Sequence, residues 1–233
     1  FLQIVPDVPK FFVASFAQVN QTTHQVKIAA LRLALAIRRA APSLPVNVQM
    51  GAVQSLCSFL FDTDVAVVGL AVDLLALMAT DKSLATEIFK NGFSKMLDIA
   101  HGNAARDVLA PLFAKLTGAL AVFYQGDVAT QIMRIENHAF SKTNLFILGS
   151  MYAACGLQKD AFMKELLATK ASLNVKDHVD AAFYKAIVLV YASGQLALAG
   201  VIEAREVQMF LFDLLAVESD HVRQAAATAL GSL

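Results

Sequence analysis

Hydrophobic residues recur along this chain with the spacing of α-helices. In residues 64–80, apolar side chains cover most of the helical surface, and only a narrow stripe of small or polar residues interrupts them: Gly69, Asp73, Ala76 and Thr80. A helix of this kind is expected to be buried from two sides. Residues 24–39 follow the same period with more charges. No segment alternates apolar and polar residues between hairpin turns, so we predict an all-α protein.

Helix-breaking residues divide this pattern into short segments. Pro42 and Pro45 are expected to end the first long helix, and Pro111 is expected to kink a later one. Further helix ends are predicted at six places: Asn91–Gly92, 101–103, 125–127, Gly156, 172–174 and Ser193–Gly194. The resulting helices are too short to be stable alone, so each must pack against its neighbours.

One apolar ridge, with positions i, i+3, i+4 and i+7, occurs repeatedly. Its copies are Val53, Leu56, Cys57 and Leu60; Phe93, Met96, Leu97 and Ala100; and Val207, Phe210, Leu211 and Leu214, with a partial copy at Val8, Phe11 and Phe12. A ridge that returns with a period of about 40 to 45 residues is typical of arrays of helical repeats.

Two segments indicate which kind of helical repeat this is. Residues 51–60 (GAVQSLCSFL) resemble the last helix of an armadillo repeat, and residues 220–230 (DHVRQAAATAL) are similar to the helix that opens the next one. Residues 62–101 resemble one complete unit. The chain is therefore identified as a member of the armadillo/HEAT superfamily, most clearly over 2–101 and 195–233, with an irregular middle at 104–192.

The resemblance implies a fold and a surface. It implies an armadillo/HEAT-like α-solenoid, a right-handed superhelix of about five degenerate repeats in a single domain over residues 1–233. Importin-alpha-like members grip basic peptides with ordered Trp and Asn residues, but this chain has no Trp and no ladder of Asn on those helices. Catenin-like grooves carry rows of Lys and Arg, whereas the last helices here carry Lys95 and no such row. Neither specialised binding mode is implied.

Composition excludes several classes of protein. Of the 233 residues 57% are hydrophobic and only 16% are charged, and 19 basic residues balance 19 acidic ones. Intrinsic disorder is excluded by this hydrophobicity, and a nucleic-acid binder would carry a basic excess. The charge-free runs at 143–158 and 186–202 fall below the roughly 20 residues that cross a bilayer, and the run at 40–61 contains two prolines. We therefore expect buried helices rather than membrane insertion.

No arrangement of residues predicts catalysis. The histidines are scattered without the spacing of metal ligands: His24, His101, His138, His178 and His221. Asp62 and Asp64 precede a helix and are expected to cap it, and Asp73 is expected to form a capping or inter-helix hydrogen bond. Cys57 and Cys155 are expected to be inert core residues. No nucleotide-binding loop or nucleophile motif is present, so we predict a non-enzyme with no catalytic, metal or cofactor site and no cofactor.

The predicted function is a protein-interaction scaffold or adaptor. Its concave surface would bind a segment of a partner protein through a largely apolar interface. Four polar residues lie off the ridge and are candidate contacts: Gln54, Ser58, Lys95 and Gln208. The alternative is a structural subunit buried in a large multiprotein assembly, since few charges are available for a solvent-exposed surface.

The two ends of the chain and its cysteines bear on whether the chain belongs to a larger assembly and on its cellular compartment. Both ends of the chain are apolar, although solenoids need polar caps, so we expect part of a longer solenoid or ends covered by other subunits. Two cysteines cannot form a disulfide framework, which favours a reducing compartment. We expect a cytoplasmic protein, or alternatively a mitochondrial one whose presequence has been removed, since the chain starts with Phe1.

Overall fold

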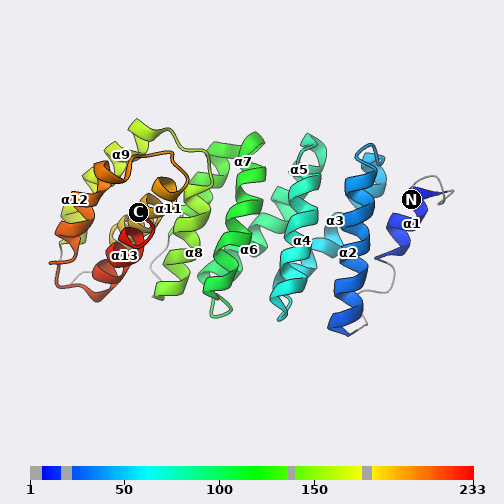
Figure 1. Cartoon of the computed structure of the whole chain (residues 1–233), viewed down its shortest axis with the longest axis horizontal. Coiled ribbons are helices and arrows are strands. Elements are labelled where there is room, and N and C mark those ends of the chain that lie inside the picture. Colours follow the sequence, from blue (N-terminus) through cyan, green and yellow to red (C-terminus); the bar gives the residue numbers. More distant parts are fainter. Residues whose placement is uncertain (1–6, 17–22, 136–139, 175–179) are drawn as a thin grey trace. The chain divides into compact units, whose positions relative to one another are not determined.

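The computed structural model is helical throughout the residues that it describes, 7–16, 23–135, 140–174 and 180–233, and no strand occurs among them (Figure 1). The predicted all-α class is confirmed. The chain divides into two compact units, Phe1–Ile99 and Ala100–Leu233, which we describe one at a time.

The first unit is built from pairs of helices. Its elements are α1 (Val8–Ala14), α2 (His24–Ala40), α3 (Val46–Ser58), a 3-10 turn (Phe59–Phe61), α4 (Val65–Met78), α5 (Lys82–Ile88), a π-helical turn (Phe89–Phe93) and the start of α6 (Ser94–His101). Helix α2 packs on α4 and α3 packs on α5, while α1 contacts both α2 and α3. Helices that are two apart in the chain order are therefore neighbours in space.

Local signals account for most helix boundaries in this unit. Helix α2 ends at Ala40 ahead of Pro42, as predicted, and Pro45 occupies the N-cap position of α3. The carboxylate of Asp64 accepts the N–H of Ala66 at 2.8 Å and so caps α4. The carboxylate of Asp81 caps α5 in the same way.

The predicted ridges form the core in both units. All twelve residues of the three complete ridge copies are buried, and in the partial copy Phe12 is buried while Phe11 is 40% exposed. Helix α4 buries seven apolar residues. Along its predicted stripe, Gly69, Asp73 and Ala76 are half-buried and Thr80 is exposed.

The helix end predicted at Asn91–Gly92 is wrong. These residues lie in the π-helical turn that carries the chain from α5 into α6. Gly92 is buried, and a Cβ atom placed on it would lie 3.0 Å from the sulfur of Cys57. The glycine thus provides space for α3 and does not end the helix.

The second unit centres on a row of adjacent helices. Its elements are a 3-10 turn (Asp107–Leu109), α7 (Ala110–Ile132), α8 (Lys142–Ala153), α9 (Lys159–Ala168), α10 (Lys170–Leu173), α11 (Ala181–Leu198), α12 (Ala204–Leu214) and α13 (Asp220–Leu230). Helix α8 packs on α7 and α11, and α11 packs on α13 (Figure 1). Helices α9, α10 and α12 pack on α11, and α12 also packs on α13.

Proline and glycine in this unit act in three different ways. Helix α6 ends at His101, Gly156 (φ +66°) follows the end of α8, and α10 ends at Leu173, as predicted. Pro111 does not kink a helix, because it lies in the first turn of α7, where its missing N–H costs nothing. The break predicted at 125–127 has a counterpart one residue earlier: Tyr124 has non-helical angles (φ −131°, ψ 32°), and two helical segments meet at this kink within Ala110–Ile132.

The end predicted at Ser193–Gly194 is wrong for a packing reason. Both residues lie inside α11, and the Ser193 hydroxyl donates to the carbonyl oxygen of Val190 at 2.7 Å. A Cβ atom on Gly194 would lie 2.7 Å from the Cα atom of Ala229 in α13. One on Gly149 in α8 would lie 2.5 Å from the Cβ atom of Tyr191 in α11. These glycines allow close helix crossings.

Two helices in the described part of the chain are long and apolar enough to cross a bilayer. They are Asp107–Ile132, which includes α7, and Ala181–Leu198, which is α11. Two thirds of the α11 window is buried against other helices, whereas only a third of the α7 window is. Burial in the core accounts for the apolar character of α11, and the expectation of no membrane insertion stays a prediction.

Candidate functional site

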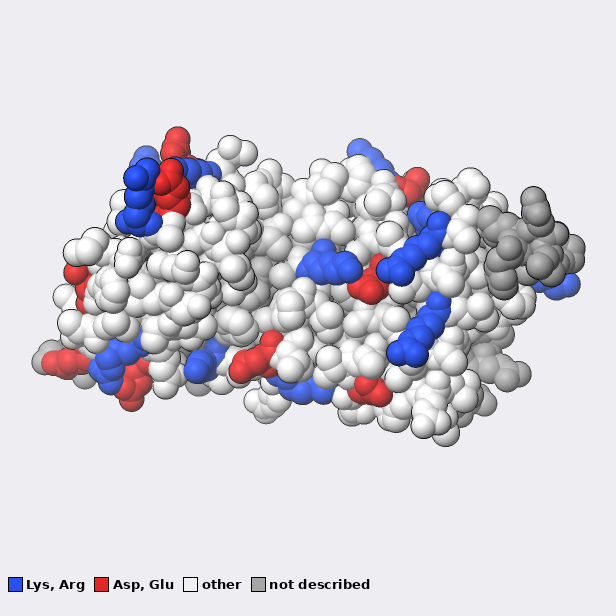
Figure 2. Space-filling view, in the orientation of Figure 1, with Lys and Arg blue, Asp and Glu red and all other residues white. Residues whose placement is uncertain are grey.

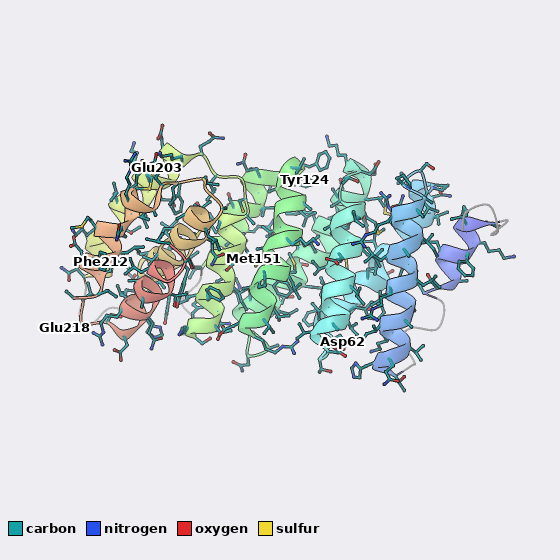
Figure 3. All side chains as sticks on the ribbon, viewed as in Figure 1. Asp62, Tyr124, Met151, Glu203, Phe212 and Glu218 are labelled. Atoms are coloured by element: carbon teal, nitrogen blue, oxygen red, sulfur yellow. The ribbon has the colours of Figure 1, made fainter. Side chains whose placement is uncertain are left out.

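Helix α12 has apolar residues on two opposite faces. Val207, Phe210, Leu211 and Leu214 are buried against the unit. On the opposite side, Met209 is 70% exposed and Phe212 is 49% exposed, and Leu215, just beyond the helix and nearer the buried face, is 37% exposed. Residues three apart lie next to each other on a helix, so these side chains form one apolar strip, the α12 outer face (Met209, Phe212 and Leu215). Figure 3 labels Phe212 on this helix.

Ion pairs fix one flank of α12. The Nζ atom of Lys159, in the first turn of α9, lies 2.8 Å from Glu206, and the Nζ atom of Lys170, in α10, lies 2.8 Å from Asp213. Glu206 and Asp213 are two helical turns apart, so α9 and α10 are tied to α12 at two points. The hydrogen bond between Lys159 and Glu206 raises the pKa of the lysine and lowers that of the glutamate.

A pocket lies at the C-terminal end of α12, and its lining residues Asp213, Leu214 and Ala216 are sequence neighbours of Phe212 and Leu215. It has a volume of about 310 Å³ and lies where α10 meets the end of α12. It is lined by three polar and three apolar residues: Lys170, Asn174, Asp213, Leu214, Ala216 and Val217. Because Lys170 and Asp213 neutralise each other, the pocket presents no excess charge. Its size and lining suit one bulky side chain of a partner protein.

The four predicted contact residues do not form one cluster. Gln54 and Ser58 lie one turn apart on α3 and are exposed, with the Ser58 hydroxyl donating to the carbonyl oxygen of Ser55 at 2.7 Å. Lys95 is half-buried on α6, and its charge acts on Cys57. Gln208 belongs to the second unit, where it is exposed beside Met209. Whether any of the four binds a partner stays a prediction.

Sequence reasoning identified the ridge of α12 but missed its outer face. The segment REVQMFLFDLL supplies more apolar residues than one ridge needs, and the surplus residues are Met209 and Phe212. That surplus was the available signal. It was not decisive, because an extra apolar residue on a repeat helix can equally face another helix of the same fold.

Both cysteines have the predicted core position. Cys57 and Cys155 are free thiols with 0% and 1% of their surface exposed. Burial raises the pKa of Cys57 to about 11 and that of Cys155 to about 12. Both thiols are therefore protonated at neutral pH, and neither is a nucleophile.

A partly buried group of charges lies where the N-terminus of α2 meets the turn before α4. Lys27 Nζ lies 2.8 Å from Asp62 Oδ2, and His24 Nδ1 lies 3.4 Å from Asp62 Oδ1. Burial opposes ionisation of Asp62, but the hydrogen bonds from Lys27 and from the N–H of Asp64, together with the Lys27 charge, outweigh it, so the pKa of Asp62 is lowered. Asp62 is thus a structural ion-pair partner rather than the predicted helix cap, whereas Asp64 is a cap.

Of the remaining histidines, those that the structure describes lie among packed residues of the fold. His101 packs edge-on against Phe140 with ring centroids 5.4 Å apart, and His221 is half-buried on α13. His138 and His178 lie outside the described residues. Across the described ranges, no three His, Cys, Asp or Glu side chains are grouped so that they could hold a metal ion.

Comparisons with known proteins add little. No protein-family model matches the chain, and no curated protein sequence matches it. Among solved structures, the chain is similar to an engineered protein whose crystal structure is known, with 17% sequence identity, 98% of each chain covered and a TM-score of 0.42. A likeness at this identity and TM-score carries no argument about function.

Proposed function

We propose that this chain is a non-enzymatic scaffold or adaptor that binds a partner protein through the α12 outer face and the adjoining pocket. The observation that carries the proposal is the exposure of Met209 and Phe212, two large apolar side chains next to each other on one helix. Contiguous exposed apolar side chains of this kind are typical of protein-interaction surfaces, whereas isolated ones are not.

A comparison within the chain supports this interpretation. When the three ridges are superimposed, the positions of Met209 and Phe212 are occupied by Ser55 and Ser58 on α3 and by Lys95 and Asp98 on α6. The repeat helix therefore tolerates polar residues at both positions. Of the three ridge helices, only α12 has apolar residues at these two positions, and the fold does not require them there. Binding of a partner gives them a role.

We assign the fold, as part of the same proposal, to an armadillo/HEAT-like solenoid. Packing of α2 on α4 and of α3 on α5 supports it, because stacked two-layer repeats bring every second helix into contact. The contacts of α11 with α8 and α13 extend the pattern within the second unit, and the ridge helices α3, α6 and α12 are the last helices of the proposed repeats. A right-handed superhelix of about five repeats is the arrangement we propose.

A second candidate function is a structural subunit of a large assembly. The low share of charged residues, 16%, favours it, as do exposed apolar residues away from α12, among them Val122 (75% exposed) and Leu198 (68% exposed). In that case several faces would be covered by neighbouring subunits, as at obligate interfaces.

The proposal also covers the cellular compartment of the protein and the class of its partners. Two buried free thiols fit a reducing compartment, and we propose the cytoplasm, with the mitochondrion as the alternative. Partners would be proteins rather than nucleic acid, since the net charge is zero, and neither membrane insertion nor a cofactor is part of the proposal.

The test is capture of native partners by the whole chain and by a variant of its outer face. Met209→Ser combined with Phe212→Ser introduces the residue type found at the same positions of α3. Val122→Ser combined with Leu198→Ser removes equally exposed apolar side chains elsewhere in the same unit and serves as the control. Each protein is used as bait, and partners are quantified by mass spectrometry.

The two candidate functions predict different results. For the scaffold, the α12 variant loses a reproducible partner that the control retains, and the isolated wild-type chain is monomeric. For the assembly subunit, the wild-type chain aggregates alone and both variants improve its solubility. If the α12 variant retains every partner, the α12 outer face is not the binding surface and the proposal is wrong.

A further inference from the structure

Helix α2 carries four basic residues and no acidic one: Lys27, Arg32, Arg38 and Arg39. Two of them have structural roles. Lys27 pairs with Asp62, and the guanidinium of Arg38 is buried, where it donates to Gln49 Oε1 at 2.8 Å and to two backbone carbonyl oxygens. Arg32 and Arg39 are exposed, and within the described residues neither forms an ion pair or a hydrogen bond. Two cations on this helix are therefore available to a partner.

The two free arginines lie on one face of α2. They are seven residues apart, which is two turns or about 10.5 Å along the axis. Gln25, Ala29 and Ala36 continue the same stripe and are also exposed. We name these five residues the α2 basic face. The short alanine side chains beside the arginines allow another helix to approach the backbone of α2. Figure 2 shows basic side chains on the surface over α2.

Charge is unevenly distributed along the first unit. Residues 1–61 contain five basic residues and one acidic residue, a net charge of +4, whereas residues 62–99 contain three basic and six acidic residues, a net charge of −3. The neutrality of the whole chain hides this separation. Because Lys27 is paired with Asp62 and Arg38 is buried, the exposed positive charge of α2 comes from Arg32 and Arg39. Exposed cations of this kind attract an acidic partner and increase its rate of association.

We propose that the α2 basic face binds an acidic α-helical segment of a partner protein. A helix with carboxylates two turns apart matches the spacing of Arg32 and Arg39. An extended strand does not, because its side chains on one side recur at about 6.6 Å and 13 Å. Arginine pairs with carboxylates through two parallel hydrogen bonds, which adds geometric selectivity to the charge attraction. Val26, 49% exposed, gives the partner helix an apolar contact at the margin of the face.

The surroundings favour a protein partner over nucleic acid. Nucleic acid presents a continuous row of phosphates and is bound by several cations in a row. Here only two free arginines face outward, and the adjacent helix α4 contains Asp73 and no basic residue. This inference shares the class of function proposed above, protein binding, but it concerns a different helix in the other unit.

The experiment uses two fluorescently labelled helical peptides of about 20 residues with the same composition. In one, glutamates at i, i+3, i+7 and i+10 lie on one face; in the other, the same glutamates are spread around the helix. Binding to the whole chain is measured by fluorescence anisotropy at low salt. We expect the one-face peptide to bind about tenfold more tightly than the spread peptide, and its binding to weaken as salt screens the charges.

Charge reversal assigns the binding to the arginines. The variant Arg32→Glu/Arg39→Glu is expected to lose at least about tenfold in affinity for the one-face peptide. The control Lys142→Glu/Lys164→Glu makes the same change in net charge at two exposed lysines of the other unit, and it should bind as the wild type does. Circular dichroism verifies that each variant is folded.

Three outcomes would overturn the inference. They are equal loss of affinity in the control, equal binding of both peptides, and tighter binding of single-stranded DNA than of the one-face peptide. The Met209→Ser/Phe212→Ser variant should bind the peptide as the wild type does. Failure here is therefore distinguishable from failure of the function proposed for α12, which is read from native partners.

Discussion

Gly194 in α11 faces the backbone of Ala229 in α13 at a distance that excludes any side chain. A Cβ atom on the glycine would lie 2.7 Å from the Cα atom of Ala229 and 3.0 Å from both its Cβ atom and its carbonyl oxygen. Rigid backbone atoms are involved, so rotation of a side chain cannot relieve the clash. The close crossing of these two helices therefore depends on glycine at position 194.

We expect Gly194→Ala to destabilise the second unit by about 1–3 kcal/mol, because the two helices must move apart to admit the methyl group. Helix propensity alone predicts the opposite, since alanine is favoured over glycine inside a helix by up to about 1 kcal/mol. The sign of the change thus separates packing from propensity. Urea unfolding followed by circular dichroism measures it.

The matched control is Gly126→Ala in α7 of the same unit. No atom lies within 4 Å of the Cβ position at Gly126, so the new methyl group has free space. This variant should be as stable as the wild type or slightly more so. If Gly194→Ala is also neutral, then α11 and α13 do not cross as closely as the structure shows.

Arg38 and Arg39 are sequence neighbours with opposite surroundings. The Arg38 guanidinium is 9% exposed and links α2 to Gln49 on α3 and to the carbonyl oxygens of Pro42 and Leu77. Arg38→Ala leaves these acceptors without a donor and opens a gap in the packing. We expect a loss of about 2–4 kcal/mol in the free energy of unfolding of the first unit.

Arg39→Ala provides the comparison at an exposed position of the same helix, and we expect a change of at most about 0.5 kcal/mol. Gln49→Ala should be non-additive with Arg38→Ala, since the two side chains share a hydrogen bond of 2.8 Å. Additive effects of these two substitutions would contradict the buried network. Thermal or urea denaturation of the wild type, Arg38→Ala, Gln49→Ala and the variant with both substitutions completes this double-mutant cycle.

Asp62 makes the stability of the first unit depend on acid pH. Its pKa is lowered in the folded state, so its contribution is fully present above the unfolded value, about 3.9, and is lost as pH falls through the folded value. Asp62→Asn should therefore destabilise the unit at neutral pH and make little difference at strongly acid pH. Urea midpoints measured between neutral and acid pH test this.

The control is Asp98→Asn, which changes an exposed carboxyl group that no ion pair engages in the described part of the chain. Its midpoint curve should run parallel to that of the wild type. A constant difference between Asp62→Asn and wild type at every pH would instead show that Asp62 acts through packing and not through its charge.

The sequence predicts helices reliably here but not what each glycine does. Periodicity predicted the all-α class, the buried ridges and the helix ends near Pro42 and Gly156. It failed at Gly92 and Gly194, which lie within continuous helical segments. The local sequence does not distinguish a glycine that ends a helix from a glycine that leaves room for a neighbouring helix. Only the position of the facing element, Cys57 in one case and Ala229 in the other, separates the two.

The candidate site was predicted only in outline. A last-helix surface with Gln208 was expected from the repeat, and Gln208 is exposed on α12. Met209 and Phe212 were not selected, because an apolar residue off the ridge is indistinguishable in sequence from a second buried face. Solvent exposure of a side chain depends on which helices pack around it, and a single sequence does not contain that information.

Each unit contains one buried cysteine, Cys57 in the first and Cys155 in the second, and these thiols can report separately on the opening of the two units. A thiol reacts as its thiolate, and here burial removes both access and ionisation, with pKa values near 11 and 12. We expect neither cysteine to react with iodoacetamide in the native protein at pH 8 on the time scale in which both react in urea.

The distinguishing step uses Gly194→Ala. Since this substitution weakens only the packing of the second unit, labelling of Cys155 should accelerate, by about 5- to 150-fold for a loss of 1–3 kcal/mol, while Cys57 is unaffected. Peptide mass spectrometry at several labelling times gives both rates from one sample, so Cys57 acts as the internal control. Equal acceleration at both cysteines would show that the two units open together, as one cooperative body. Fast labelling of either thiol in the wild type would contradict its buried position.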